Sequence, residues 1–465
     1  MHDLAITSAT LVTSSGRRHA TIVIDAGRIS ALLEPGAQVD AREIIDASGL
    51  LVLPGLVDAH VHLRDPGLTH KEDFASGTAA AAVGGVTTVM VMPTDRPMTT
   101  TAALLEEKRH LGEGRAQVDF ALQALVGPGT EPGEVERLAA AGAISFELFL
   151  ADMAAPMQVN TGAELLACLR AVAATGRVAG ISAGDESIVA AYTQPGMHEQ
   201  ASSREAFLRS RPAVAEAMGL ARALVAAQAA GARVHIRQMS SAQGLAVLEG
   251  LRGTGSLDGE PSAGSPDVSR IDVTSEVTPH NLLLDEGFVK VLGPVAKVLP
   301  PLRRAHDLAC LRTALREGRI DMVATDHAPH LPAEKAAGNV DLALAPGGLA
   351  GLQTWLPLML SMVSDRLLDE STLVRVCCEA PARRFGLWPR KGSLEPGADA
   401  DLVLIDPRRP FTIRNADQQS RAAQTPFDGR QTPATPVLTL LRGEVIAREG
   451  QRVGKARGRL VTPAD

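Results

Sequence analysis

The sequence lacks several features that mark particular classes of protein. Its four cysteines show no CxxC spacing, so they predict neither a zinc knuckle nor a disulfide framework, and we interpret them as reduced, buried thiols. The first residues do not combine a basic start with an apolar run, as a secretion signal does. No stretch reaches the roughly 18 uninterrupted apolar residues of a membrane span. We therefore expect a cytoplasmic protein with no membrane partner.

The chain also has little excess of charge of either sign. Lys and Arg number 46 against 53 Asp and Glu, for a formal net charge of −7, and no block of like charges occurs. A surface without a basic patch does not attract nucleic acid or anionic lipid. We therefore expect a small molecule or a modified peptide as the partner.

Both ends of the chain are rich in short strands. The first 53 residues read as strands separated by turns, and the last 70 or so repeat that style, with a turn-rich approach to an apolar strand over 391–405 and a hairpin over 437–448. We predict a small composite β-sandwich domain built from residues 1–53 and 389–465.

The middle of the chain alternates apolar strands with alanine-rich helical patterns, which is typical of parallel βα units. Eight candidate strands predict the α/β fold class and a (β/α)8 TIM-type barrel over residues 54–388, with an active site at the carboxyl ends of the strands. The candidate strands span residues 51–60, 86–92, 118–126, 143–149, 178–182, 232–238, 271–279 and 320–326.

One segment interrupts this pattern. Residues 252–270 are rich in Gly, Ser, Pro and Asp and have little apolar surface to bury, so we expect a mobile insertion. A disordered surface loop and a substrate lid are both open interpretations.

Two histidines at the end of the first candidate barrel strand indicate a metal site. His60 and His62 are two residues apart, so their imidazoles point to the same face of the strand, which is the barrel interior. Asp326 ends the eighth candidate strand, where an inward carboxylate can serve as both ligand and proton acceptor.

The stretch around this pair closely resembles the signature of the dihydroorotases, which belong to the amidohydrolase superfamily. It runs from Asp58 to Asp73 as DAHVHLRDPGLTHKED. Further motifs resemble the dihydroorotase, allantoinase and hydantoinase group, and the resemblance extends over nearly the whole chain. These motifs span residues 84–88, 276–280, 300–303, 325–329, 397–401 and 425–429. The resemblance implies a metal-dependent hydrolase that forms homo-oligomers.

The departures from the family pattern concern the second metal. Family members hold two metals through the His-x-His pair, a carboxylated lysine on strand four, one histidine each on strands five and six, and the strand-eight aspartate. Here those lysine and histidine positions hold Glu147, Ser182 and Gln238. Serine and glutamine are poor replacements for imidazole on zinc. We therefore expect one zinc ion per chain, with the ligands His60, His62, Glu147 and Asp326.

The resemblance also suggests residues that contact the substrate. Arg64 resembles the dihydroorotase arginine that holds the substrate carboxylate, although a structural ion pair with Asp65 or Asp73 is the alternative. Thr94 stands where the family has an asparagine. His280 and His330 are either substrate contacts or structural hydrogen-bond partners. We expect His235 to pack in the core, because it lies three residues from Gln238 and faces the other side of the strand.

These residues together predict hydrolysis of a non-standard C–N bond in a cyclic amide, a ureide or a modified peptide. Asp326 is the predicted catalytic base, because it can take a proton from water and return it to the leaving nitrogen. The alternative is a catalytically silent, dihydroorotase-like scaffold subunit, because the second metal's ligands are lost.

Overall fold

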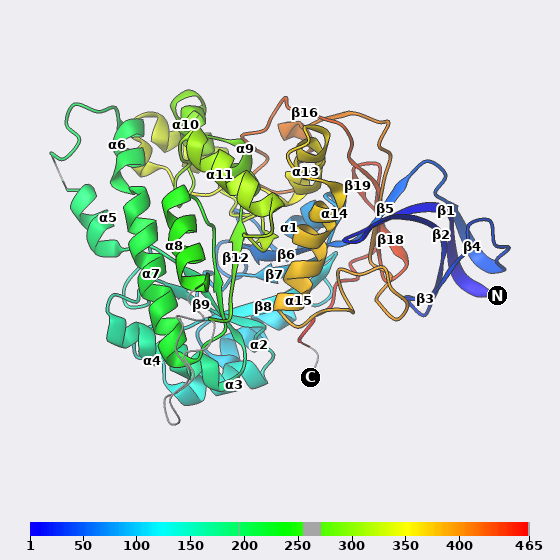
Figure 1. Ribbon diagram of the computed structural model, residues 1–465, viewed down its shortest axis with the longest axis horizontal. Coiled ribbons are helices and arrows are strands. Elements are labelled where there is room, and N and C mark those ends of the chain that lie inside the picture. The colour runs from blue at the N-terminus through cyan, green and yellow to red at the C-terminus, as the bar shows by residue number, and fades with distance from the viewer. Residues whose placement is uncertain (195, 254–270, 464–465) are drawn as a thin grey trace.

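A computed structural model describes the chain except for residues 195, 254–270 and 464–465. Its central feature is a parallel barrel of eight strands in sequential order from β6 to β13 (Figure 1). The first and last strands meet through a parallel bridge between Val61 and His327, so the barrel is nearly closed. The barrel strands are β6 (Leu56–Val61), β7 (Val86–Val91), β8 (Asp119–Leu125), β9 (Ser145–Phe149), β10 (Val178–Ser182), β11 (Val234–Ile236), β12 (Val273–Val277) and β13 (Met322–Val323). This arrangement confirms the predicted fold class.

Helices surround the barrel, as the alanine-rich patterns between strands predict. Helix α1 begins at a capping box in which the Asp73 side chain accepts from the Ser76 amide. The α-helices are α1 (Phe74–Val83), α2 (Ala102–Gly112), α3 (Pro132–Ala140), α4 (Gly162–Ala174), α5 (Glu186–Tyr192), α6 (Ser203–Ser210), α7 (Ala213–Ala230), α8 (Ala242–Gly253), α9 (Pro279–Leu283), α10 (Glu286–Leu292), α11 (Ala305–Arg316), α12 (Pro332–Ala336), α13 (Trp355–Ser364), α14 (Glu370–Val374) and α15 (Ala380–Arg384). The short 3-10 or π turns are η1 (Gly293–Ala296), η2 (Ala337–Asn339), η3 (Leu342–Leu344), η4 (Leu352–Thr354), η5 (Arg375–Glu379) and η6 (Asn415–Asp417).

One helical stretch, Ser203–Ala230, is long and apolar enough in composition to cross a membrane. It comprises α6 and α7, and 44% of its most apolar window is buried inside the protein. Helix α7 packs against α4 and α8. A core helix of a barrel has the same composition as a membrane span, so this stretch is weak evidence for membrane insertion.

The two ends of the chain form one nine-stranded sheet at the side of the barrel (Figure 1). Its path is β19-β18-β17-β14-β5-β1-β2-β3, and β4 pairs with β1. The apolar faces of these strands enclose a core of their own, which includes Ile6, Ile22 and Leu404. The strands are β1 (His2–Thr13), β2 (Gly16–Asp25), β3 (Arg28–Leu33), β4 (Ala41–Asp46), β5 (Leu51–Pro54), β14 (Leu402–Ile405), β17 (Pro436–Leu441), β18 (Glu444–Arg448) and β19 (Gln451–Arg452), and the separate pair is β15 (Phe411–Thr412) with β16 (Gln431–Thr432).

The candidate strand 51–60 is two strands: β5 pairs in the terminal sheet, and β6 starts the barrel after Gly55. A Cβ at Gly55 would lie 2.2 Å from Oγ1 of Thr87, so the chain passes closely over β7 where it changes sheets. In the predicted insertion 252–270, Arg252 lies within α8, and residues 254–270 are outside the described residues.

Candidate metal centre

Three side chains converge at the carboxyl ends of the first and last barrel strands. His60 and His62 lie at the end of β6, and Asp326 follows β13. Nε2 of each histidine lies 3.3 Å from the same carboxylate oxygen, Oδ1 of Asp326. The ligand atoms of the three residues all lie within 4.8 Å of one another, a spacing that suits a shared metal ion.

The other ring nitrogen of each histidine is already engaged. His60 Nδ1 lies 2.5 Å from Glu276 Oε1, and His62 Nδ1 lies 2.8 Å from Thr94 Oγ1. A carboxylate that accepts from Nδ1 fixes the tautomer and leaves the Nε2 lone pair for a metal. Thr94 was expected to contact the substrate. The structure places it behind His62 instead, where it orients the ring.

Three residues around the centre have left-handed backbone conformations. Arg64, Gln238 and Asp326 have φ of 59°, 52° and 46°. Residues with a side chain adopt this region at a cost, and such residues cluster at functional sites. Each one lies just after a barrel strand, where the turn aims its side chain across the mouth of the barrel.

Burial and mutual charge set the protonation of the cluster. Burial by itself lowers the pKa of His60, but Glu276 and Asp326 outweigh burial and raise it overall. Burial lowers the pKa of His62 to about 3, so this imidazole is neutral. Burial opposes ionisation of Asp326, yet the charge of His60 and the hydrogen bond from His62 lower its pKa overall. The neutral His62 ring beside the Asp326 carboxylate is ready to bind a cation, and a bound metal ion would displace the proton that the raised pKa of His60 favours.

Glu147, the expected fourth ligand, lies elsewhere. Its two carboxylate oxygens accept hydrogen bonds from Arg237. Nε of Arg237 lies 3.1 Å from Oε2, and Nη2 of Arg237 donates to Oε1. Both side chains are fully buried. We correct the sequence assignment: Glu147 forms a buried ion pair rather than joining the metal cluster.

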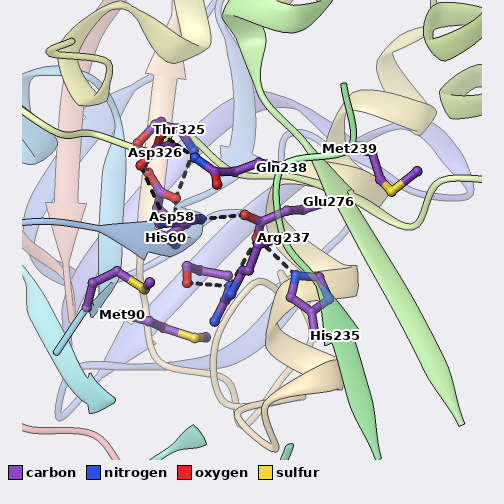
Figure 2. Close-up of polar contacts among 12 residues, drawn as sticks. Asp58, His60, Met90, His235, Arg237, Gln238, Met239, Glu276, Thr325 and Asp326 are labelled. Carbon is purple, nitrogen blue, oxygen red and sulfur yellow. Dashed lines mark hydrogen bonds and ion pairs between the residues drawn. The ribbon is translucent and has the colours of Figure 1, made fainter. Parts of the chain in front are cut away.

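Sequence reasoning missed Arg237, although a signal was present. His235 and Arg237 are two residues apart, and alternation along a strand places them on the same face. Both do point into the barrel, where His235 Nε2 and NH1 of Arg237 lie 2.9 and 3.0 Å from Glu276 Oε2 (Figure 2). His235 is buried, as expected, but it points into the barrel and joins this polar network rather than facing away from the interior.

The two positions that lack the family histidines differ in their contacts. Ser182 lines the cavity above the cluster. Gln238 instead reaches Asp326, and its Nε2 donates to Oδ2 of Asp326 at 2.5 Å and to the Leu299 carbonyl at 3.1 Å. The glutamine amide therefore presents a donor to the carboxylate and holds it in place.

A cavity of about 340 Å³ opens above the cluster. Arg64 and His330 line it, whereas His280 is buried beside the cluster, where its electrostatic neighbours are Asp326 and His60. Burial lowers the pKa of His330 to about 2, so the ring is neutral. Its Nε2 lies 3.1 Å from the Gly347 carbonyl and its Nδ1 lies 3.3 Å from Lys71 Nζ, which fits a ring that donates to the first and accepts from the second.

This tautomer leaves Arg64 without a strong partner. The terminal nitrogen NH2 of Arg64 is 3.3 Å from Nε2 of His330, which already carries the proton shared with Gly347, and Arg64 Nε is buried without a hydrogen bond. Within the described part of the chain Arg64 makes no ion pair, so the alternative of a pair with Asp65 or Asp73 is not realised. Those two carboxylates pair with Arg115.

Comparison with known proteins identifies the architecture. Residues 51–446 match the family model described as the amidohydrolase family. An L-hydantoinase from Paenarthrobacter aurescens is 34% identical, over 99% of this chain and 98% of its own length. A dihydroorotase from Mycobacterium tuberculosis is 35% identical, over 92% of this chain and 95% of its own.

Solved structures agree with the sequence relatives. The structure of an L-hydantoinase from Arthrobacter aurescens superposes with a TM-score of 0.93 at 33% identity, covering 99% of this chain and 100% of that one. The likeness includes the barrel and the sheet formed by the two ends of the chain. The chain therefore belongs to the amidohydrolase family, in the group of cyclic amidohydrolases that contains the hydantoinases and dihydroorotases.

Proposed function

We propose that this chain is a zinc-dependent hydrolase of a non-standard C–N bond and holds one metal ion between His60, His62 and Asp326. The observation that carries the proposal is the convergence of two Nε2 atoms on one oxygen of Asp326, 3.3 Å from each. Imidazole and carboxylate are ligands that suit zinc, and three protein ligands leave a position open for chemistry.

The surroundings of the three residues fit a metal ion. Glu276 and Thr94 occupy the Nδ1 atoms of the two histidines, so both Nε2 atoms remain directed at the centre. When bound, a divalent ion polarises the scissile carbonyl and makes a water molecule more acidic.

Asp326 is the residue that we propose moves the proton. With Oδ1 facing the histidines, Oδ2 accepts a proton from the attacking water and returns it to the leaving nitrogen. Gln238 donates one N–H to Oδ2, and a carboxylate oxygen has a second lone pair for this transfer. The amide holds the carboxylate in one orientation throughout, so little reorganisation is needed between the two proton transfers.

The substrate class follows from Arg64. A partly buried guanidinium that faces a cavity without an ion-pair partner is costly unless the ligand supplies an anion. We propose that the substrate is a cyclic amide, a ureide or a modified-peptide amide with a carboxylate, which Arg64 binds by two parallel hydrogen bonds. The relatives named L-hydantoinase and dihydroorotase support a cyclic substrate.

Metal analysis combined with a substrate panel tests this proposal. Purified protein should contain one zinc per chain, and the panel should pair cyclic amides that bear a carboxylate with matched compounds that lack it. His60→Ala should lose both the metal and the ring-opening activity. Replacing exposed His110, which lies on α2, by alanine gives a matched control that should keep both.

A metal-free wild-type protein with no hydrolytic activity on the panel would contradict the proposal. That result would favour the alternative, a catalytically silent dihydroorotase-like scaffold subunit. We further propose a cytoplasmic location and a homo-oligomeric state. The second of these is tested by light scattering, which should give a mass that is a multiple of the chain mass.

A further inference from the structure

The interior of the barrel below the metal centre contains one buried guanidinium. Arg237 follows β11, and its side chain is fully buried. A guanidinium has five N–H donors, and all five of Arg237 find acceptors inside the protein. These are both oxygens of Glu147, Oε2 of Glu276, Oε1 of Gln123 and the carbonyl of Ala59.

Two buried carboxylates share this single cation. Glu147 comes from β9 and Glu276 from β12, and both are fully buried. Buried carboxylates need a cation, because their loss of hydration is otherwise uncompensated. Gly180 on β10 supplies the space, since a Cβ there would lie 2.1 Å from Oε1 of Glu147.

The residues at this level do not fit a second metal ion. The carboxylate of Glu147 is fully engaged by Arg237, and Gln238 presents its N–H donors to Asp326 and Leu299. A donor that faces the site repels a cation. Ser182, the remaining candidate, offers only a neutral oxygen, which is a weak ligand for zinc.

The same guanidinium is connected to the first metal's ligands. Oε2 of Glu276 accepts from Arg237, and Oε1 of Glu276 lies 2.5 Å from His60 Nδ1. Figure 2 shows Glu276 between Arg237 and His60. The orientation of the His60 ring therefore depends on a carboxylate that Arg237 holds in place.

We propose that Arg237 is the permanent cation of the barrel interior: it neutralises Glu147 and Glu276 in place of a second metal ion and, through Glu276, positions His60 as a ligand. Arg237 is a positioning residue in this scheme, because it does not touch the reacting atoms. The inference rests on the metal site proposed above. It adds the prediction that the site holds one metal ion because Arg237 occupies the place of the second, and not only because two histidine ligands are missing.

The first measurement is the zinc content of the wild-type holoenzyme in excess zinc, followed by removal of loosely bound metal. We expect one tightly bound ion per chain, and His60→Ala should abolish its binding. Two tightly bound ions would overturn the inference and leave the proposed hydrolase function standing. No bound ion would overturn both.

The second measurement uses the double variant Arg237→Met with Glu147→Gln. The two changes remove the Arg237–Glu147 ion pair together, and Glu276 keeps the imidazoles of His60 and His235 as its partners. Thermal unfolding first establishes that the variant is folded. Zinc affinity, measured by competition with a chelator, should fall by about 10- to 100-fold, as happens when a group that orients a metal ligand is lost. The pH at which zinc is released should rise, because without the positive charge of Arg237 the His60 ring is protonated more easily.

A matched control and a conservative variant complete the test. Arg384→Met removes another buried arginine, which holds Asp272 and the Val234 carbonyl, and it should leave zinc affinity unchanged. Arg237→Lys keeps the charge but cannot reach both carboxylates at once, so it should recover only part of the affinity. Wild-type zinc affinity in the double variant would show that Arg237 is only structural, and the inference would be wrong.

Discussion

At the scale of the residue, Arg64 gives the sharpest prediction. Arg64→Met should lower kcat/KM for a carboxylate-bearing substrate by about 10- to 100-fold, since hydrogen bonds to a charged group contribute about 1.5–3 kcal/mol. The same change should raise the melting temperature, because it removes a partly buried guanidinium whose Nε has no hydrogen bond and which has no anionic partner in the described chain. Steady-state kinetics and thermal unfolding measure the two effects.

The control for Arg64 is a substrate of the same ring size that lacks the carboxylate. Its kcat/KM should change little in the variant. Equal losses on both substrates would mean that Arg64 shapes the cavity rather than binding the carboxylate.

Some residues of the site could be assigned from the sequence, and others could not. The spacing of His60 and His62 was enough to predict that both imidazoles point into the barrel, because side-chain direction on a strand depends only on alternation. Glu147 was misassigned because the sequence does not say which cation a buried carboxylate will find. That cation, Arg237, lies 90 residues away and meets Glu147 only when the barrel closes.

At the scale of the element, the barrel strands show a different limit. The run from Leu51 to His60 is apolar except for Asp58 and His60, and it forms β5 and β6 in two different sheets. Both sheets bury both faces of this run, so no alternation marks the boundary. The close approach of Gly55 to Thr87 accompanies the change of sheet, and that contact is between segments distant in sequence.

Thr325 joins the two strands that carry the metal ligands. Its Oγ1 donates to Oδ2 of Asp58 at 2.6 Å and accepts from the amide of His327 at 3.0 Å. Thr325→Val should lower stability by about 1–3 kcal/mol, because it leaves a buried carboxylate oxygen and an amide unsatisfied. Zinc affinity should fall as well, since β6 and the segment after β13 lose the side-chain hydrogen bond that joins them beside His60 and Asp326.

The comparison for this prediction is Thr325→Ser, which keeps the hydroxyl. It should retain nearly all of the zinc affinity, as measured by chelator competition. If the serine and valine variants bind zinc equally, the hydroxyl does not align the two strands.

Helix α12 predicts a dependence of stability on pH. Burial lowers the pKa of Lys335 to about 7, and its Nζ donates to the Lys297 carbonyl. In the described chain Lys335 has no carboxylate within ion-pair distance. Between pH 7 and the unfolded value of about 10.4, the unfolded chain binds a proton that the folded chain does not. Stability should therefore rise with pH across this window, by up to about 1.4 kcal/mol per pH unit.

Melting temperatures recorded from pH 6 to pH 9 measure this effect. Lys335→Met should be more stable than wild type at pH 6 and should show a flatter profile. Replacing the exposed Lys290 of α10 by methionine should keep the wild-type slope. A Lys335→Met profile parallel to that of wild type would contradict the assignment.

At the scale of the whole molecule, the sequence predicted the assembly of both ends into one unit better than it predicted the contacts that hold this unit to the barrel. Short strands and turn residues at both termini predicted a composite β-sandwich domain built from the two ends. One contact between this unit and the barrel is a charge cluster in which Asp119 lies 272 residues before Lys391. Lys391 Nζ lies 2.5, 2.9 and 2.7 Å from Asp119, Asp399 and Asp401.

This cluster predicts how the molecule unfolds. Asp119 begins β8 of the barrel, and Asp401 directly precedes β14 of the terminal sheet, so Lys391 binds both units. Lys391→Met leaves buried carboxylates without this cation and should cost about 3–5 kcal/mol. Calorimetry should show one unfolding transition in wild type and two in the variant, because the sheet no longer depends on the barrel. Exposed Lys455, replaced by methionine, is the control that should keep one transition. A single transition at the wild-type temperature in Lys391→Met would mean that apolar packing alone joins the two units.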